Sequence, residues 1–336
     1  EIAQCLVGSE MCIRDRRYCD GFFEKFDKAD GICKECYSNT DFFKCNRCIP
    51  SLKEIELDYP LLINWTITGK CQNKCVYCYG DDIIQCNDIT LKEDLEEIIN
   101  HLRYINPRVI VVSGGEPLLH PQIQYILEHL SFCDVIVDTN GLAISQDFFR
   151  HIKENTHIRI SIDSEKEEIN GVLRKNKNSN ATRTVINNIM QCVERNIPFS
   201  VHTVLSDVNA RGITELGDFL IGIGVKLWRI LIVTPNDFLI DKDNVNKIWI
   251  EDAVERIKEY ANENRERIKI RLANNGIYSG RGIILLNPEG KYFVRKINEK
   301  EKSIVDINNP KFPKVEQIMN CLEHNAHIER YLYEMI

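Results

Sequence analysis

Three cysteines on one short stretch carry the strongest chemical signal in the sequence. They lie in the segment Cys71-Gln-Asn-Lys-Cys75-Val-Tyr-Cys78. Cysteine thiolates bind zinc or iron–sulfur clusters. A [4Fe–4S] cube usually takes four protein ligands, so three cysteines leave one iron open, and an open position is typical of a catalytic rather than a structural metal centre. The alternative is a structural zinc site that recruits a fourth ligand such as Cys86.

A second group of cysteines lies nearer the start of the chain, as Cys33-Lys-Glu-Cys36 and Cys45-Asn-Arg-Cys48. Four thiolates complete the tetrahedral coordination of Zn²⁺, which is the pattern of a closed structural site. The short segment between the two pairs would have little core without a metal. The pattern favours zinc, with a second iron–sulfur cluster as the alternative.

Composition restricts the class of protein. The chain has 336 residues, of which 43% are hydrophobic and 28% charged, as in ordinary globular proteins. Its net charge of −7 argues against a general nucleic-acid binder, and no apolar run approaches the roughly 18 residues of a membrane span. Many of its 14 cysteines stand in tight groups and not in a spread disulfide framework. We therefore expect an intracellular, cytoplasmic protein that binds metal.

The first residues have an unusual texture. Residues 6–15 resemble a translated sequencing adapter, so we expect residues 1–16 to be a non-native tail and exclude them from the prediction of the fold. The cysteine-rich metal module then covers residues 17–56.

From residue 57 onward, short apolar runs alternate with amphipathic stretches. This alternation predicts βαβ units and a parallel sheet that is buried on both faces. We expect an α/β fold, a partial or full (β/α) barrel of six to seven parallel strands over residues 57–272. The expected strands are Leu61–Thr66, Val109–Val112, Val135–Asp138, Ile158–Ile162, Phe199–Leu205, Leu227–Val233 and Ile268–Leu272.

Helical periodicity lies between the expected strands. The clearest apolar face consists of Leu91, Leu95, Ile98, Ile99 and Leu102. Thr90 and Glu93, at the start of this stretch, have the spacing of a capping box. Further helices are expected around residues 185–193, 213–223 and 247–264. Residues 273–336 form a short C-terminal extension, with a β-hairpin whose turn is Asn287-Pro288-Glu289-Gly290, followed by helical or irregular chain.

Polar and glycine-rich segments follow several expected strands. They are Ser113-Gly114-Gly115-Glu116-Pro117, Asp138-Thr139-Asn140-Gly141 and Ser161-Ile162-Asp163. With the CxxxCxxC loop after the first strand, this ordered set resembles the radical S-adenosylmethionine (SAM) superfamily over roughly residues 61–235. The carboxyl ends of barrel strands are where such folds carry their chemistry.

The resemblance implies a cofactor site. It makes Cys71, Cys75 and Cys78 ligands of a [4Fe–4S] cluster whose open iron is chelated by SAM. It further implies that Glu116 accepts from the SAM ammonium and that Arg174 or Arg183 is a candidate partner of the SAM carboxylate. For each arginine taken alone, a surface arginine at a helix entry is the favoured interpretation. The residues expected to contact SAM are Tyr77, Gly114, Gly115, Glu116, Asn140, Ser161 and Asp163. His202 is a candidate for substrate contact, with a core histidine as the alternative.

The resemblance also implies a reaction, namely reductive cleavage of SAM to a 5′-deoxyadenosyl radical that abstracts hydrogen from a substrate. An electron-donor protein of the flavodoxin or ferredoxin type would supply the electron. The segment from Ser279 to Gly290 resembles the start of a SPASM or twitch extension, but the expected cysteines are absent and only Cys321 follows it. Three hypotheses remain, a radical SAM enzyme on a peptide or protein side chain, one on a nucleotide or cofactor precursor, and a non-catalytic zinc-stapled binding protein.

Overall fold

A computed structural model describes residues 59–78, 86–232, 247–274, 280–297, 305–306, 312–324, 326–327 and 330. The adapter-like tail and the cysteine-rich module at 17–56 lie outside these residues, as do the predicted zinc ligands Cys33, Cys36, Cys45 and Cys48.

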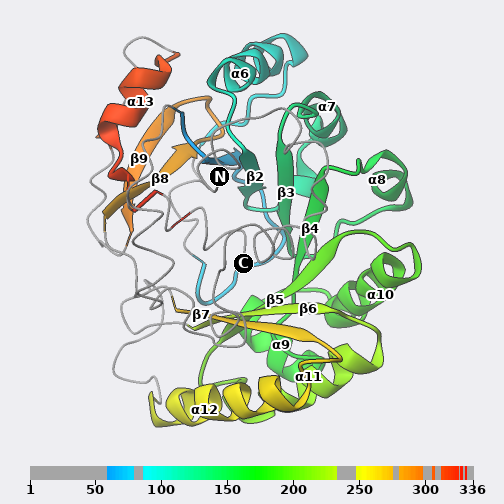
Figure 1. Cartoon of the computed structure of the whole chain (residues 1–336). Coiled ribbons are helices and arrows are strands. Elements are labelled where there is room, and N and C mark those ends of the chain that lie inside the picture. Colours follow the sequence, from blue (N-terminus) through cyan, green and yellow to red (C-terminus); the bar gives the residue numbers. More distant parts are fainter. Residues whose placement is uncertain are drawn as a thin grey trace.

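One curved sheet organises the described chain (Figure 1). Seven strands, β1 to β7, run parallel and in chain order, each paired with the next. The strands are β1 Leu62–Thr68, β2 Val109–Gly114, β3 Asp134–Thr139, β4 Thr156–Ser161, β5 Phe199–Leu205, β6 Leu227–Ile232 and β7 Lys269–Asn274. The seven predicted strands are confirmed. In the described chain the sheet stays open, so the partial barrel is right and the full barrel is wrong.

Helices connect the parallel strands and cover the outer side of the curve (Figure 1). They are α6 Lys92–Ile105, α7 Ile123–His129, α8 Gln146–His151, α9 Glu167–Arg174, α10 Ala181–Glu194, α11 Ile213–Gly222 and α12 Lys247–Glu263. Buried apolar strand residues such as Ile160 face these helices, since a Cβ built at Gly141 would lie 2.8 Å from Ile160 and 3.1 Å from Val185 of α10. Because side chains alternate along a strand, the neighbouring positions face the concave side.

Four residues of the predicted apolar face of α6 are buried in the core, namely Leu95, Ile98, Ile99 and Leu102, whereas the fifth, Leu91, is 64% exposed. The predicted capping box is wrong, because the helix begins at Lys92 and its N-cap is Leu91, with no side-chain cap. A tertiary contact fixes this entry, since the N–H of Ile89 donates to the carbonyl of Pro288 at 3.2 Å. The hairpin turn therefore positions the start of α6.

The predicted hairpin is confirmed as β8 Gly280–Leu286 and β9 Tyr292–Ile297, which pair antiparallel. β8 also pairs in parallel with β1, so the hairpin continues the same sheet, and β10 Val305–Asp306 forms its far edge. The helical turn α13 Val315–Cys321 follows.

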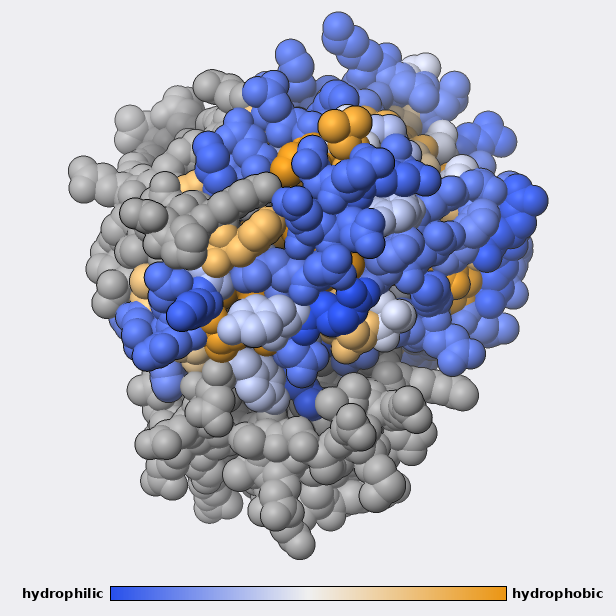
Figure 2. Space-filling model, turned by 90° about the horizontal axis from the view of Figure 1, so that it is seen from above, coloured by the Kyte–Doolittle hydropathy of each residue, from blue (hydrophilic) through white to orange (hydrophobic). Residues whose placement is uncertain are grey.

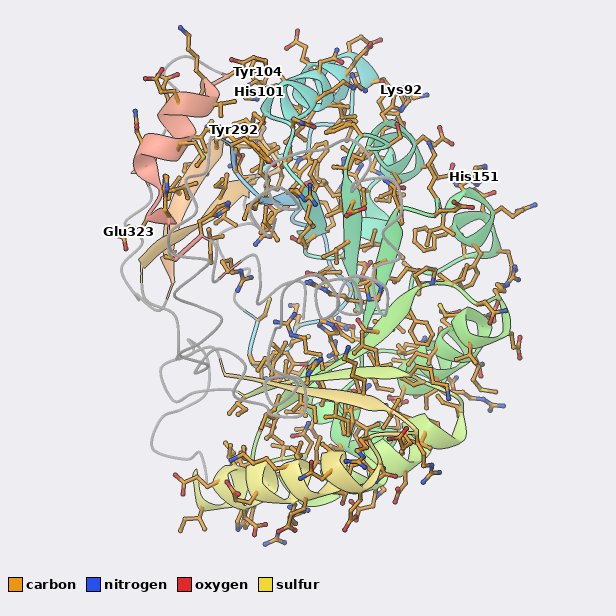
Figure 3. The ribbon with its side chains drawn as sticks, in the orientation of Figure 1. Lys92, His101, Tyr104, His151, Tyr292 and Glu323 are labelled. Atoms are coloured by element: carbon orange, nitrogen blue, oxygen red, sulfur yellow. The ribbon has the colours of Figure 1, made fainter. Side chains whose placement is uncertain are left out.

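Aromatic contacts join α6 to the hairpin (Figure 3). His101 lies edge-on to the ring of Tyr292, with centroids 5.1 Å apart. Its Nδ1 lies 2.8 Å from the Tyr292 hydroxyl, and its Nε2 lies 2.9 Å from the carbonyl oxygen of Pro313. A carbonyl only accepts, so Nε2 donates to Pro313 and Nδ1 accepts from Tyr292 when the ring is neutral.

The surface of the described chain is largely hydrophilic where it is seen from above, with small hydrophobic spots (Figure 2). Large exposed apolar side chains such as Leu91, Val172 and Ile248 lie on different helices or beside them. Every helix within the described ranges is too short or too polar to cross a membrane.

A buried histidine ties the end of the chain to the sheet. His327 is fully buried, and its Nε2 accepts from the N–H of Leu61 at 2.9 Å while its Nδ1 donates to the carbonyl of Gly282 at 2.8 Å. Burial lowers the pKa of His327 to about 4, although the bond to Gly282 raises it. The ring is therefore neutral, and it links the start of β1 to β8.

The first prediction concerns acid stability. The histidine pKa is about 4 in the folded chain and near 6.5 in the unfolded chain. Between these two pH values the unfolded chain therefore binds more protons than the folded chain. The neutral ring of His327 thus stabilises the fold fully above pH 6.5, and this contribution is lost as the pH falls toward 4. We expect His327→Gln to lower the thermal midpoint at pH 7.5 and the gap to wild type to narrow toward pH 5. Scanning fluorimetry from pH 5 to 7.5 measures this. The control is His151→Gln, at an exposed histidine of α8, and a gap independent of pH would contradict the prediction.

A candidate cofactor site at the carboxyl ends of the strands

The loop with the three cysteines follows β1 and lies against helix α9. The N–H of Lys74 donates to the carbonyl of Arg174 at 3.1 Å, and the N–H of Val76 donates to that of Leu173 at 2.9 Å. The last carbonyls of a helix have no partner within the helix, so the loop completes the hydrogen bonding of the end of α9. Inside the loop, the N–H of Cys78 donates to the carbonyl of Cys75 at 3.2 Å.

The three thiols form a donor set that a cation would stabilise. Burial raises the pKa of Cys75 to about 11. The positive charge of Arg174 lowers this pKa, whereas Asp163 and the other two thiols raise it further. Burial also raises the pKa of Cys71, whose sulfur accepts from the N–H of Asn73 at 3.4 Å and the amide of Asn140 at 3.8 Å. Thiolates become the favoured form when a metal compensates their charge.

Three thiols on one loop are a donor set that a [4Fe–4S] cluster would take with one thiolate on each of three irons. Among the described residues, no three Cys, His, Asp or Glu side chains are arranged around a single point. The alternative fourth ligand, Cys86, instead accepts from the amide of Asn287 at 3.8 Å.

Two glycines let the end of β2 approach the base of the loop. The N–H of Gly115 donates to the carbonyl of Thr68 at 2.7 Å, and the N–H of Glu116 donates to that of Lys70 at 2.8 Å. A Cβ at Gly114, whose φ is +140°, would lie 2.3 Å from the Thr68 oxygen, and a Cβ at Gly115 would lie 2.4 Å from the Lys70 oxygen. Only glycine allows this approach. The expected approach to SAM by the same backbone stays a prediction.

The carboxylate of Glu116 is completely buried beneath the loop. It accepts from the hydroxyl of Thr139 at 2.8 Å and from the N–H groups of Asn140 at 2.7 Å and Leu118 at 3.1 Å. Burial raises the pKa of Glu116 to about 7, while these three bonds lower it. The side chain thus joins the ends of β2 and β3. The predicted bond to the SAM ammonium would use acceptor capacity beyond these three bonds.

A buried ion pair holds the other side of the loop. Asp163 follows β4, and Arg174 ends α9, with the Arg174 Nε 2.9 Å from one Asp163 oxygen and a terminal nitrogen 3.2 Å from the other. The Tyr77 hydroxyl donates to Asp163, and the Arg174 guanidinium lies 6.0 Å from the Tyr77 ring centroid. The N–H of Val204 also donates to Asp163, at 2.9 Å. Asp163 therefore positions Tyr77, the residue before Cys78.

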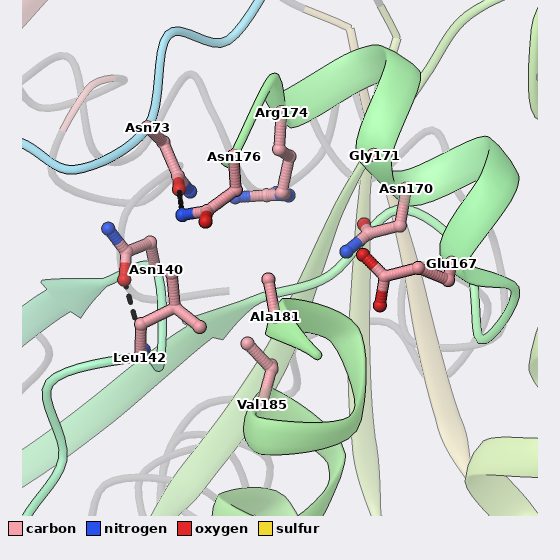
Figure 4. Close-up of a pocket in the computed structure, with 10 residues that line it drawn as sticks. All are labelled: Asn73, Asn140, Leu142, Glu167, Asn170, Gly171, Arg174, Asn176, Ala181 and Val185. Carbon is pink, nitrogen blue, oxygen red and sulfur yellow. Dashed lines mark hydrogen bonds between the residues drawn. The ribbon is translucent and has the colours of Figure 1, made fainter. Parts of the chain in front are cut away.

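A pocket of amide side chains opens between this ion pair and the end of β3 (Figure 4). It is lined by Asn73 from the cysteine loop, Asn140 after β3, Arg174 and Asn170 of α9 and Asn176 beyond it. The Asn176 amide donates to the Asn73 oxygen, and the Asn140 oxygen accepts from the N–H of Leu142 at 3.0 Å. The lining offers amide donors and acceptors together with one guanidinium, Arg174, and one carboxylate, Glu167.

The structure brings most of the expected SAM contacts together, but not all. Asn140 touches Cys71, and Tyr77 touches Asp163. Ser161 ends β4 with its side chain partly exposed, and Arg183 is exposed on α10, away from the ion pair made by Arg174.

His202 lies in the middle of β5 and is in register with Ser161 at the end of β4. Its Nε2 is 3.1 Å from the Ser200 hydroxyl, and burial lowers its pKa well below the usual range. Sequence reasoning missed the amide lining, for which the signal is the asparagine-rich run Asn176-Lys-Asn-Ser-Asn180 after α9.

Residues 65–220 match the family model of the radical SAM superfamily. This part of the chain, slightly under half of its 336 residues, is similar to the radical SAM superfamily. It contains the cysteine loop, both glycines, Glu116, Asn140 and Asp163, so all of the site described above lies inside the matched part.

Curated relatives are similar to this part of the chain in sequence, and solved structures have a similar fold. An uncharacterised protein of Methanocaldococcus jannaschii is 30% identical over 168 residues, which are 48% of this chain and 58% of that protein. An S-adenosylmethionine-dependent nucleotide dehydratase of Flammeovirga pacifica is 24% identical over 69% of this chain and 81% of that protein. The fold is similar to that of Streptococcus suis SuiB bound to precursor peptide SuiA, with a TM-score of 0.62 and 14% identity over 81% of this chain and 66% of SuiB.

The second prediction tests the close approach of β2 to the loop. We expect Gly115→Ala to lower the free energy of unfolding by about 1–3 kcal/mol, because a methyl group must displace backbone at Lys70. It should also reduce the iron bound after anaerobic reconstitution, because the base of the cysteine loop shifts. Urea unfolding and iron analysis measure the two effects. Gly222→Ala is the matched control, since its Cβ would meet nothing within 4 Å, and equal stability of the two variants would contradict the prediction.

Proposed function

We propose that this chain is an enzyme that cleaves SAM reductively and removes a hydrogen atom from a substrate. The observation that carries the proposal is the three-cysteine loop at the carboxyl ends of β1 and β2, inside the matched radical SAM domain. Cys71, Cys75 and Cys78 would hold a [4Fe–4S] cluster with one open iron, and that iron would bind SAM. The non-catalytic binding protein is the alternative that the experiment below excludes or supports.

When bound and reduced, a [4Fe–4S] cluster would supply one electron for cleavage of the C5′–S bond of SAM, with release of methionine and transfer of one substrate hydrogen atom to give 5′-deoxyadenosine. The residues of this chain would bind SAM and orient it beside the cluster. Asn140 and Arg174 line the polar pocket beside the loop, where they suit the amino acid part of SAM. Gly114 and Gly115 let the end of β2 approach Thr68 and Lys70 at the base of the loop, and Glu116 joins the ends of β2 and β3.

Tyr77, Ser161 and Asp163 complete the proposed SAM contacts. Tyr77 and Asp163 are hydrogen-bonded to each other, which supports a role in fixing the loop near the adenosine part. Ser161 ends β4 at the same edge of the sheet. A low-potential electron-donor protein of the flavodoxin or ferredoxin type would reduce the cluster, because the cleavage consumes one electron.

Two substrate classes fit this reaction. The likeness to SuiB shows the fold alone, so a peptide or protein side chain rests on the resemblance of the hairpin segment to peptide-modifying enzymes. A nucleotide or cofactor precursor is favoured by the sequence similarity to the nucleotide dehydratase, which extends over 69% of this chain. We propose the small molecule as the first class to test.

The third prediction tests SAM cleavage. The full chain, reconstituted without oxygen, should form 5′-deoxyadenosine from SAM and dithionite, and Cys78→Ala should abolish this and lower bound iron by about four atoms, the content of one cube. Product analysis and iron and sulfide assays measure both. Cys321→Ala is the matched control because Cys321 lies on α13, outside the loop. A wild-type chain that carries zinc at the loop and forms no 5′-deoxyadenosine would overturn the proposal.

The fourth prediction concerns the cysteine-rich module at residues 17–56, for which we propose a zinc site at Cys33, Cys36, Cys45 and Cys48. The double substitution Cys33→Ser with Cys36→Ser should remove about one zinc per chain, because two ligands of a tetrahedral site are lost. Iron bound at Cys71, Cys75 and Cys78 should be unchanged. Elemental analysis distinguishes the outcomes, and loss of iron in place of zinc would favour a second cluster.

A further inference from the structure

The chain returns to the base of the cysteine loop just before helix α6 begins. There the carboxylate of Asp88 accepts from the hydroxyl of Thr68 at 2.7 Å and from the N–H of Gly69 at 3.1 Å. The ammonium of Lys70 lies 3.4 Å from one of the same carboxylate oxygens. These three partners are consecutive in the chain, and Cys71 follows them directly. Asp88 therefore closes the loop at its base, and we call its contacts with these three residues the Asp88 clasp.

The carboxylate of Asp88 is nearly shielded from solvent. Its side chain is 6% exposed, whereas that of Lys70 is 65% exposed, and an exposed ammonium contributes little to such a pair. The hydrogen bonds from Thr68 and Gly69 therefore supply most of the compensation that a nearly buried charge needs. Thr68 is itself fully buried, and its hydroxyl oxygen accepts from the N–H of Lys70 at 3.0 Å. One hydroxyl thus joins Asp88 to the residue before Cys71.

The backbone beyond β2 holds the same turn from the other side. The carbonyls of Thr68 and Lys70 accept from the first two N–H groups after β2, at 2.7 and 2.8 Å. The turn is therefore bound through its carbonyls by one element, and through a hydroxyl and an N–H by the clasp. Because Cys71 is the next residue, its position depends on both sets of contacts.

The residue after Asp88 is fixed through both of its backbone groups. The N–H of Ile89 donates to the carbonyl of Pro288 at 3.2 Å, and its carbonyl accepts from the Nε2 of His120 at 2.9 Å. Burial lowers the pKa of His120, so the ring is neutral and its Nδ1 accepts from the N–H of Gln122 at 3.1 Å. Two other parts of the fold therefore hold the segment that carries Asp88.

The hairpin turn between β8 and β9 makes further contacts with this segment. The amide of Asn287 donates to the sulfur of Cys86 at 3.8 Å, and the N–H of Asn87 donates to the carboxylate of Glu289. The hairpin lies outside residues 65–220, which match the family model. A continuous set of contacts thus leads from the C-terminal hairpin, through the clasp, to the base of the cysteine loop.

We propose that Asp88 is a positioning residue for the metal-binding cysteines and that the hairpin turn holds it in place. A donor that is already fixed loses less conformational freedom when it binds metal, so the clasp favours metal binding by Cys71 and its neighbours. Release of the metal requires the loop to open, and each bond of the clasp lowers the population of the open form. The inference rests on the proposed function for the identity of the metal group as an iron–sulfur cluster.

The fifth prediction tests the clasp through metal release. The full chain, reconstituted with iron without oxygen, is mixed with bathophenanthroline disulfonate, and absorbance follows the release of iron. The Cys78→Ala chain identifies the iron that belongs to the loop. We expect Asp88→Asn and Thr68→Val each to speed this release at least about tenfold, because a hydrogen bond to a buried charge is lost. The double variant should be no faster than the quicker single variant, since both substitutions break the same bond.

Two further variants separate the hydroxyl and the hairpin turn. Thr68→Ser keeps the hydroxyl, so it should release iron within about twofold of the wild-type rate. Asn287→Ala should speed release, because the Asn287 side chain accepts from the N–H groups of Glu289 and Lys291 at 3.1 and 2.8 Å and so shapes the turn that holds Ile89.

The matched control is Tyr260→Phe, which breaks one hydroxyl–carboxylate bond far from the loop, that of Tyr260 to Asp218 at 2.8 Å between α12 and α11. Urea unfolding measures its stability, and its iron release should equal that of wild type. Equal acceleration by Tyr260→Phe, or wild-type release by Asp88→Asn and Thr68→Val, would overturn the inference. A chain that carries zinc at the loop would refute the proposed function alone, and release of zinc to zincon then decides the clasp by the same comparison of variants.

Discussion

The buried carboxylate of Glu116 lies where the cysteine loop, β2 and β3 meet. The carboxylate accepts three hydrogen bonds, from Thr139, Asn140 and Leu118. The backbone N–H of Glu116 donates to the carbonyl of Lys70, just before the cysteine loop. A buried carboxylate without such partners would be strongly unfavourable, so the surrounding donors have to stay in place. Asn140, held in this way, then reaches the sulfur of Cys71. The position of the first cysteine thus depends on a charge that makes no contact with it.

The ion pair between Asp163 and Arg174 has the corresponding role at the opposite side of the loop. Asp163 follows β4, Arg174 ends α9, and Tyr77 of the loop donates to Asp163. Both charged groups are buried. Buried pairs add little stability compared with apolar residues, but removal of one partner leaves an uncompensated charge. Such pairs are therefore better suited to fixing one arrangement than to raising stability. Two carboxylates, Glu116 and Asp163, hold the loop between them.

The concave face of the sheet differs from the outer face in a way that suits a reaction chamber. The outer face is apolar and packs against helices, as expected for parallel strands. The inner face carries arginines, histidines and hydroxyls on the same strands, where an inert core would have aliphatic side chains. Such polar interiors reduce stability and are retained where a ligand has to be bound.

The sequence by itself determined the strand and helix order, because hydrophobic periodicity is a local property of the chain. It also indicated the chemistry, since CxxxCxxC, Ser113–Pro117 and Asp163 are recognisable by residue type and spacing. Hydrophobic periodicity does not determine whether the strands close into a full barrel. Only the tertiary structure showed that the sheet of the described chain is open and that β8 pairs with β1. The start of α6 was likewise set by a contact with Pro288, about 200 residues away in sequence, against the local capping signal.

Tertiary structure alone also assigned partners to charged residues. From the sequence alone, Arg174 and Arg183 are equally good candidates for the SAM carboxylate. In the structure, Arg174 forms an ion pair with Asp163, whereas Arg183 is exposed on α10. The bonds of His327 to Leu61 and Gly282 join segments far apart in the chain, and only the register of β6 and β7 shows that Arg229 lies opposite Arg271. Sequence patterns identify which residues can do chemistry, but the pairing of distant charges depends on the packing of the whole sheet.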